Sequence, residues 1–264
     1  MMVASKYREI LERLGLTSLE QVRRFHGELV KNHRGRRDIL RIVAADSAGR
    51  PLTLYLKRNW KPYKKDGLAS LWRRGRVWSQ SRQEWENCLA LQRAGVATAE
   101  LAAWGEECGP LWERFSFILT EAAPGRPLSA FLAECADRSL RRRVIEALAD
   151  LVRRMHDAGL AAPDLFTRHV FLDLEGERPR FRLIDMARLD RRRLPLRLRA
   201  RDLAALNAAA PLRHVSARER ILFLRRYAGR TDRRLARAVA KRMKRLLKRR
   251  KFRDFAAEPP FPNA

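Results

Sequence analysis

The hydrophobic pattern of the chain changes its period near residue 122, and this change limits the folds that the chain can adopt. Before it, short runs alternate apolar and polar residues between turn residues, as in LTLYLK at positions 52–57. Such alternation is typical of antiparallel strands. After Gly125 the apolar residues follow helical spacing, most clearly over residues 138–158. We therefore predict an α+β protein in which a small antiparallel sheet precedes a larger and mostly helical part.

The same patterns predict the order of elements on either side of the change. The first part should contain a helix over residues 5–14, strands in GELVKN, RRDILRIVAA and LTLYLKR, a helix over residues 81–95, and a strand pair that ends in RFSFILTEA. The second part should contain helices over residues 127–134 and 138–158, the short strands HVFLDL and RFRLIDM, and helices from Arg199 onward. We expect two domains, residues 1–122 and 123–264, with a linker near residues 122–127.

The charge balance is strongly one-sided. The sequence contains 58 Lys and Arg residues against 30 Asp and Glu residues, which gives a formal net charge of +28. A protein with this balance carries a strong positive field and is expected to meet a polyanionic partner. Nucleic acid, anionic lipid headgroups and phosphorylated glycans all satisfy that expectation.

The cysteines and the first residues place the chain in a broad class. Cys88, Cys108 and Cys135 are widely separated and lack CxxC spacing. This argues against a disulfide framework or a zinc site and favours a reducing compartment.

The N-terminal residues are charged throughout, unlike a signal peptide. No apolar run approaches the roughly 20 residues that span a bilayer. We expect a protein that is cytoplasmic or peripheral on a membrane.

Four residues form an ordered series that suits phosphoryl transfer. That reaction requires a cation on the nucleotide phosphates, a carboxylate for the metal and a carboxylate near the attacking hydroxyl. Lys57 ends an alternating strand, Glu84 lies on the following helix, Asp164 follows the long helix, and Asp185 ends a short strand. Each residue taken alone also fits an ordinary role as a solvated strand end, helix surface, turn or cap. Their joint order makes them candidates for one active site.

The sequence around these residues resembles the bacterial lipopolysaccharide core kinases, the heptose and Kdo kinases, which are remote relatives of protein kinases. The family's catalytic loop reads H-x-D-x-x-x-x-H, and Asp164 with His169 matches its second half. The family's metal-binding strand end reads I-D-L-x-R, which Asp185 and Arg188 match within IDMAR. SRQEWENCLALQRAGVAT similarly resembles the family's E-W…L…L…AGV helix. The resemblance covers about residues 25–230 and implies a two-lobed, protein-kinase-like fold.

The resemblance implies a role for each matching residue. Asp164 would accept or orient the proton of a sugar hydroxyl. Asp185 would hold Mg²⁺, and His169 occupies the place of the asparagine that binds metal in protein kinases. Lys57 would bind the α- and β-phosphates of ATP, and Glu84 would orient Lys57.

Two further positions follow from the resemblance, and two departures accompany it. Glu121, in FILTEAAPG, falls where the family's hinge receives adenine through backbone groups. Asp202, in RDLAAL, would brace the catalytic loop. Ala162 and Pro163 stand where the family has a His or Arg before the catalytic aspartate, and no G-x-G-x-x-G loop is present.

The function implied by the resemblance is ATP-dependent phosphorylation of a heptose or Kdo hydroxyl in the lipopolysaccharide inner core. Its cofactors would be ATP and Mg²⁺. Its partners would be the lipopolysaccharide core or lipid A precursor and the anionic cytoplasmic face of the inner membrane, with no nucleic acid. Three alternatives stay open: a kinase-like phosphotransferase for another acceptor, a catalytically inactive binding module, and a basic nucleic-acid-binding protein without enzymatic activity.

Basic and aromatic stretches outside the motifs bear on the partner. Lys and Arg are concentrated between residues 188 and 201 and in the helix predicted over residues 236–253. Val239, Met243, Leu246 and Leu247 on that helix would suit docking at a membrane interface or packing onto the helical lobe. Trp60, Trp72 and Trp78 fall in a predicted exposed insertion, where they would reach the membrane interface or pack in the core.

Overall fold

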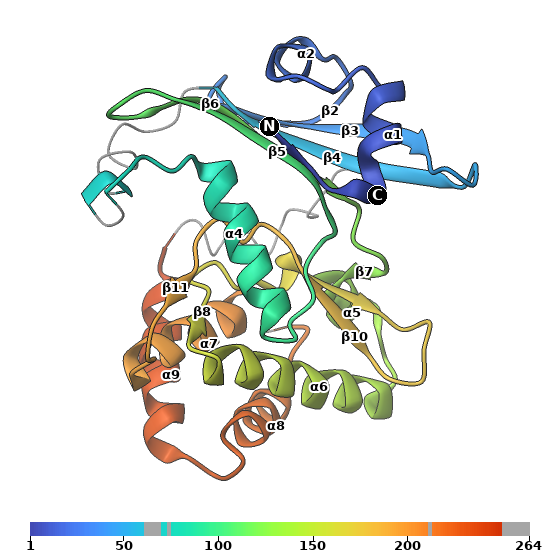
Figure 1. Ribbon diagram of the computed structural model, residues 1–264. Helices are drawn as coiled ribbons and strands as arrows, with labels where there is room; N and C mark the ends of the chain where they lie inside the picture. Colours follow the sequence, from blue (N-terminus) through green and yellow to red (C-terminus); the bar gives the residue numbers. More distant parts are fainter. Residues whose placement is uncertain (61–69, 73–74, 211–212, 250–264) are drawn as a thin grey trace. The chain divides into compact units, whose positions relative to one another are not determined.

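The computed structural model describes residues 1–60, 70–72, 75–210 and 213–249, and the chain divides into two compact units (Figure 1). The first unit comprises Met1–Leu89 and Ala99–Ala122, and the second comprises Ala90–Thr98 and Ala123–Ala264. Most of the predicted insertion, the end of the predicted basic helix and the Pro-rich tail lie outside the described residues. The roles assigned to the two predicted domains stay predictions.

The first unit contains a six-stranded sheet in which all neighbouring strands are antiparallel, in the order β1-β5-β6-β4-β3-β2. The strands are β1 (Met2–Val3), β2 (Glu28–Asn32), β3 (Arg37–Ala45), β4 (Pro51–Asn59), β5 (Leu101–Cys108) and β6 (Glu113–Glu121). The helical segments are η1 (Ser5–Tyr7), α1 (Arg8–Arg13), α2 (Leu19–Arg24) and α4 (Gln80–Arg93), whose last turn belongs to the second unit. Helices α1 and α2 lie on one face of the sheet and the first part of α4 on the other (Figure 1).

Strand β4 divides its side chains between these two faces. Leu52, Leu54 and Leu56 are buried in the core beneath α1 and α2. Because successive side chains of a strand point to opposite faces, Lys57 projects toward the face that α4 covers. The alternation that predicts a strand in the sequence therefore also fixes the direction of its lysine.

An ion pair between Asp38 of β3 and Arg58 of β4 joins the sheet to the α2 region. Arg58 donates to both carboxylate oxygens of Asp38 at 2.9 Å, and the two side chains are only 12% and 8% exposed. The same guanidinium donates to the carbonyls of Val22, Arg23 and Phe25 at the end of α2. The indole N–H of Trp60 donates to Asp38 at 2.9 Å. These bonds satisfy a buried charge and several orphan carbonyls at once.

Replacing Asp38 by alanine should destabilise the protein strongly. The substitution leaves Arg58 buried without its counter-charge, and breaking such a pair costs about 3–5 kcal/mol. Urea denaturation would measure the change in the free energy of unfolding. The matched control is Glu20→Ala, which removes an exposed ion pair with Arg24 and should change stability by less than about 1 kcal/mol. Equal effects of the two substitutions would contradict this account of Asp38.

The second unit is mostly helical. Its helical segments are α5 (Leu128–Glu134), α6 (Arg138–Asp157), η2 (Thr167–His169), α7 (Leu196–Ala209), α8 (Ala217–Ala228) and α9 (Arg233–Leu247). Its short strands are β7 (Arg126–Pro127), β8 (Leu160–Ala161), β9 (Val170–Asp173), β10 (Arg180–Leu183) and β11 (Asp190–Arg191), which form the sheets β10-β9-β7 and β11-β8. Helix α8 packs along α6, and α9 packs along α7. The predicted order of helices and short strands is confirmed.

No helix among the described residues combines the length and the apolar composition of a membrane-spanning segment.

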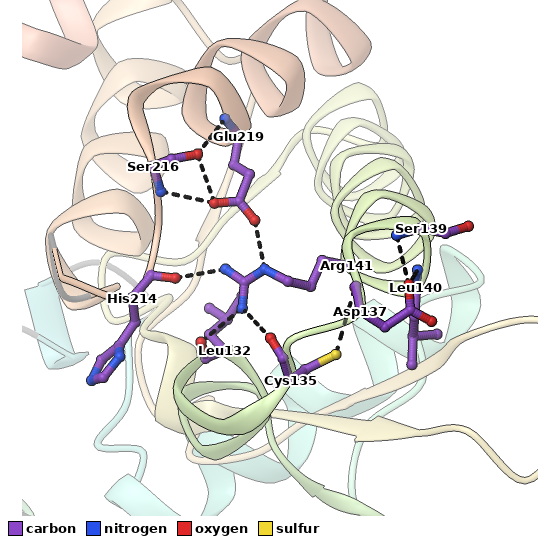
Figure 2. A network of polar contacts seen from close by, with 9 residues as sticks. All are labelled: Leu132, Cys135, Asp137, Ser139, Leu140, Arg141, His214, Ser216 and Glu219. Carbon is purple, nitrogen blue, oxygen red and sulfur yellow. Dashed lines mark hydrogen bonds and ion pairs between the residues drawn. The ribbon is translucent and has the colours of Figure 1, made fainter.

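A single buried arginine joins three segments of the second unit (Figure 2). Arg141 of α6 donates to Glu219 of α8 at 2.7 Å and to the carbonyls of Leu132, Cys135 and His214 at 2.6–3.1 Å. Glu219 also forms a capping box with Ser216 at the start of α8. The guanidinium thus satisfies the last carbonyls of α5 and fixes the start of α8 against α6.

The apolar side of α9 is used inside the second unit. Leu235 and Val239 are buried, while Met243, Leu246 and Leu247 pack against a cluster that includes Phe166 and the alanines of α7. Of the two roles considered for this side of the helix, packing onto the lobe is therefore the one that the fold adopts. Helix α7 begins at Leu196, earlier than predicted, because Pro195 can precede a helix but cannot continue one.

The three tryptophans near the predicted insertion have different surroundings. Trp60 packs beside Phe115 with ring centroids 5.1 Å apart. The ring of Trp78 lies beneath the guanidinium of Arg82, 4.6 Å from its centroid. Trp72 is 90% exposed. Only Trp72 is thus left open to an interfacial role.

Candidate active site

The first unit holds Lys57 and Glu84 together as a nearly buried ion pair. The ammonium of Lys57 donates to the two carboxylate oxygens of Glu84 at 2.9 and 2.8 Å. The side chains are 13% and 8% exposed. The pairing predicted from their order in the sequence is thus present, and it holds the lysine in one orientation. A cation fixed in this way can receive phosphate oxygens without first being ordered.

Carboxylates at the start of α4 hold that helix in place. The N–H of Gln80 donates to Glu113 at 2.9 Å, and the N–H of Ser79 donates to Glu106 at 3.1 Å. Negative charge at a helix N-terminus satisfies orphan N–H groups and interacts favourably with the helix dipole. Burial raises the pKa of the Glu113 carboxyl. Burying the Glu113 carboxylate costs desolvation free energy, but its hydrogen bond fixes the start of α4 and thereby the position of Glu84.

Glu121 lies at the end of β6 in the first unit. Its carboxylate accepts hydrogen bonds from the hydroxyl of Tyr7 and from Lys6, the latter at 2.9 Å. The N–H groups of Glu121 and Ala122 donate to the carbonyls of Glu100 and Thr53, both at 2.9 Å. Adenine would therefore need other backbone groups of this stretch. The assignment of Glu121 to nucleotide binding stays a prediction.

In the second unit, Asp164 is held by an arginine that follows Asp185 in sequence. Arg188 forms a bidentate ion pair with Asp164, with Nε 2.6 Å from Oδ2 and Nη2 bonded to Oδ1. The carboxylate is 20% exposed and the guanidinium 63% exposed. The planar fork of an arginine fixes the plane of a carboxylate as well as its position. Asp164 is thus oriented before any acceptor arrives.

His169 joins the loop of Asp164 to the strand end that carries Asp185. Its Nδ1 lies 3.0 Å from the carbonyl oxygen of Asp164, and its Nε2 lies 3.9 Å from Oδ2 of Asp185. Arg168 donates to the same Nε2 at 3.1 Å. Because an arginine can only donate, Nε2 must accept, and the ring proton resides on Nδ1 and bonds the Asp164 carbonyl.

Asp185 adopts a backbone conformation that is uncommon for residues other than glycine. Its φ is +56°, in the left-handed region. On one side the N–H of Ile184 donates to the carbonyl of His169 at 3.0 Å, and on the other Met186 is 1% exposed. Such a conformation costs on the order of 1–3 kcal/mol and persists where the surrounding contacts determine it. It places a 40% exposed carboxylate beside His169.

A buried network behind the loop contains the predicted Asp202. Its side chain is fully buried, lies 3.4 Å from Nε2 of His156 and accepts a hydrogen bond from Arg201 at 2.8 Å. Nδ1 of His156 lies 2.7 Å from the hydroxyl of Tyr227. Arg201 also donates to Asp190 of β11 at 2.7 Å, and β11 pairs with β8 just before Asp164. These contacts connect Asp202, through Arg201 and β11, to the residues that precede Asp164. Its role as a brace of the catalytic loop stays a prediction.

The carboxylate of Asp185 fits a magnesium ion better than His169 does. Mg²⁺ is usually held by one or two carboxylates together with substrate phosphates. No group of three His, Cys, Asp or Glu side chains in the described part of the chain is arranged to hold a metal. Nε2 of His169 already accepts from Arg168, and a metal there would have to displace that cation. His169 as a metal ligand stays a prediction.

Comparison with known proteins gives the family. The profile of the lipopolysaccharide kinase (Kdo/WaaP) family matches residues 20–227. The chain belongs to this family. A lipopolysaccharide core heptose(I) kinase WaaP of Pseudomonas aeruginosa is 35% identical over 170 residues, covering 61% of this chain and 63% of that protein. A protein of the same name from Escherichia coli is 34% identical over 134 residues, covering 47% and 51%. The matched region thus spans between half and two thirds of these relatives.

A solved structure confirms the predicted fold. WaaP in complex with acyl carrier protein superposes on this chain with a TM-score of 0.68 and 27% sequence identity, covering 97% of this chain and 99% of that one. The kinase-like α+β fold expected from the order of elements is therefore present in this family member.

The sequence pattern missed several partners of the predicted residues. Arg188 was matched to the family motif, but its ion pair with Asp164 was not anticipated. His156 was also missed, although it lies one position after Met155 on the buried side of α6. Its place in a run of apolar helix positions is the signal that pointed to a buried histidine with polar partners.

The tautomer of His169 can be tested without any substrate. In ¹⁵N-histidine NMR spectra, His169 should appear as the neutral form protonated at Nδ1, because Arg168 occupies Nε2. The exposed His26, which has no side-chain partner in the described part of the chain, serves as the control and should show both neutral tautomers. A His169 ring protonated at Nε2 would contradict the assigned network.

Proposed function

We propose that this protein transfers the γ-phosphoryl group of ATP to a sugar hydroxyl of the lipopolysaccharide inner core. The observation that supports this most directly is that His169 bonds the Asp164 carbonyl through its ring and the N–H of Ile184, beside Asp185, through its own carbonyl, in a member of the lipopolysaccharide kinase family. A catalytic-loop carboxylate and a metal-binding carboxylate held beside each other are the parts that this reaction requires.

Phosphoryl transfer depends mainly on positioning and electrostatic stabilisation. In the proposed reaction, Asp164 accepts a hydrogen bond from the attacking hydroxyl and takes up its proton as the hydroxyl oxygen bonds to the γ-phosphorus. The bond between that phosphorus and the β–γ bridging oxygen breaks at the same time, and ADP leaves. Arg188 keeps the carboxylate in a fixed plane, so that little reorientation is needed when the acceptor binds. The relatives named as heptose(I) kinases support a heptose as the acceptor.

The remaining residues act on the nucleotide. Lys57, oriented by Glu84, binds the α- and β-phosphates, and the backbone near Glu121 receives adenine. Asp185 would hold Mg²⁺, and His169 lies beside Asp185. When bound, Mg²⁺ neutralises the charge that develops on the phosphate oxygens.

We also propose that the protein works on the cytoplasmic face of the inner membrane, and that α9 supplies its contact. Six exposed cations follow one side of the helix, opposite the residues that pack on α7. This α9 cationic face consists of Arg234, Arg237, Lys241, Lys244, Arg245 and Lys248. None of the six forms an ion pair in the described part of the chain. Each basic residue near an anionic bilayer gains about 1 kcal/mol.

The transfer reaction tests the proposed activity. Asp164→Asn and Asp185→Asn should each reduce phosphate transfer from γ-labelled ATP to dephosphorylated lipopolysaccharide core by about 10²–10⁴-fold, with little loss of stability. Glu175→Gln, a change at an exposed acidic residue of the same unit, is the control and should leave transfer intact. Near-full activity of the Asp164 variant would refute the catalytic assignment. Absence of transfer by the wild type would refute this acceptor.

Vesicle binding tests the membrane contact separately. Changing Arg237, Lys241, Lys244 and Lys248 to Gln should weaken binding to phosphatidylglycerol-containing vesicles by at least about 100-fold, since four favourable charge contacts are lost. The control changes Arg138, Arg143, Arg218 and Arg225 to Gln. It alters net charge equally, so it should have a much smaller effect. Equal effects would mean that total charge, and not the α9 cationic face, governs binding. Stronger binding to DNA than to vesicles would favour a nucleic-acid partner.

A further inference from the structure

An arginine-rich stretch follows Asp185 in the sequence and contacts the residues that lead to Asp164. We call residues 188–194 the arginine segment. Its contacts with residues 159–164 are Arg188 with Asp164, Asp190 opposite Ala161, Arg191 opposite Leu160, and the N–H of Arg192 with the Gly159 carbonyl at 2.9 Å. The segment thus runs antiparallel to the residues that lead to Asp164.

The segment is fixed in this place by close backbone contact. Gly159 has a φ of +76°, and a Cβ built on it would lie 3.1 Å from the carbonyl oxygen of Arg192. Leu194 is 9% exposed and packs with Ala161 and Leu198. Gly159 permits the close contact with the Arg192 backbone, and the buried Leu194 fixes the end of the segment. Together they fix the backbone that carries the intervening arginines.

The charges of this region are only partly neutralised. Residues 188–201 contain seven arginines and one aspartate. Arg188, Arg199 and Arg201 pair with Asp164, Asp157 and Asp190 respectively. Arg192 and Arg193 are exposed and form no ion pair with any residue that the structure describes. Neither charge is neutralised within the described chain, so both cations retain their field for an external anion.

We propose that Arg192 and Arg193 bind an anionic group of the acceptor, a phosphate or a carboxylate. This inference rests on the proposed function and specifies what the acceptor must carry. Guanidinium groups recognise both kinds of anion through paired N–H donors. The proposed recognition site pairs with the residues that lead to Asp164, which engages the acceptor hydroxyl in the proposed reaction.

The length of the chain limits how far from Asp164 that anion can lie. Arg192 is bonded to Gly159, and five residues of chain from Gly159 to Asp164 span at most about 18 Å. One oligosaccharide acceptor can therefore reach both Asp164 and the backbone that carries Arg192. Arg192 and Arg193 select acceptors by this charge while Asp164 engages the hydroxyl.

The experiment compares two double variants on three acceptors. The test variant is Arg192→Gln with Arg193→Gln, and the control is Arg143→Gln with Arg218→Gln, which changes net charge equally. Arg143 and Arg218 lie near the starts of α6 and α8, roughly 20 Å along α6 from the end that precedes Gly159. The acceptors are deacylated core oligosaccharide, the same after phosphatase treatment, and the same with its carboxylates methyl-esterified.

For the intact acceptor, the test variant should raise the acceptor KM about 10–100-fold, as expected for lost charge-assisted hydrogen bonds. Its KM for ATP and its kcat should change less than about twofold, and the control should match the wild type. With the wild type, one of the two treatments, removal of the phosphates or esterification of the carboxylates, should raise the acceptor KM by a similar factor. The treatment that does so identifies the recognised anion. With the test variant, the same removal should have little further effect, because the two changes remove one interaction.

The outcomes separate this inference from the proposed function. A wild type that phosphorylates none of the three acceptors refutes both. A wild type that transfers phosphate while the test variant keeps its acceptor KM refutes the role of Arg192 and Arg193 alone. Acceptor changes that raise KM equally in the wild type and the test variant also refute it, since the anion would then be bound elsewhere.

Discussion

With 58 cationic side chains and 30 carboxylates, the chain cannot pair every positive charge, and the placement of its carboxylates shapes the structure. Buried arginines take part in the tightest networks: Arg58 with Asp38 in the first unit and Arg141 with Glu219 in the second. Each also donates to backbone carbonyls at the end of a helix. An unpaired buried guanidinium would cost several kcal/mol. Carboxylates are therefore placed beside these buried arginines, and the cations without a carboxylate lie on the surface.

The same scarcity distinguishes two kinds of surface. Where function requires an oriented charge, a carboxylate and a cation are held together, as in the Lys57–Glu84 and Asp164–Arg188 pairs. Where an external anion is proposed to bind, the cationic side chains have no carboxylate partner in the described chain, as on the α9 cationic face and at Arg192 and Arg193. Paired charges are fixed in orientation at the expense of some field strength, whereas unpaired ones retain their field for an external anion.

His169 illustrates how a motif residue acquires a role from its neighbours. The family pattern places it where protein kinases have a metal ligand. In this structure its Nδ1 proton bonds the Asp164 carbonyl, and Arg168 occupies Nε2. The ring thus bonds the loop of Asp164, and the backbone carbonyl of His169, which accepts from Ile184, joins that loop to the strand end of Asp185. A hydrogen-bonding role requires no metal, and it explains why a residue better suited to softer metals than Mg²⁺ is compatible with this site.

Residue order and periodicity were sufficient to predict the alternating strand that directs Lys57, the helix that carries Glu84, and the order of helices in the second unit. These features are local, because strand and helix periods are set by the backbone within a few residues. The patterns did not predict α2 or the two-residue strands β8 and β11. The six-residue helix α2 spans less than two turns, and each of these strands has only two residues, so neither displays its period clearly. They form because distant segments supply their partners.

The sequence by itself determined the fold class, the family resemblance and the order of Lys57, Glu84, Asp164 and Asp185. The tertiary structure alone decided that Arg188 holds Asp164, that the apolar side of α9 packs on α7, and that Arg192 and Arg193 form no ion pair in the described chain. The physical reason is the range of the interactions involved. Backbone periodicity depends on neighbouring residues, whereas ion pairs and packing form between side chains far apart in the sequence. The sequence therefore does not show which of its many arginines pair with a carboxylate.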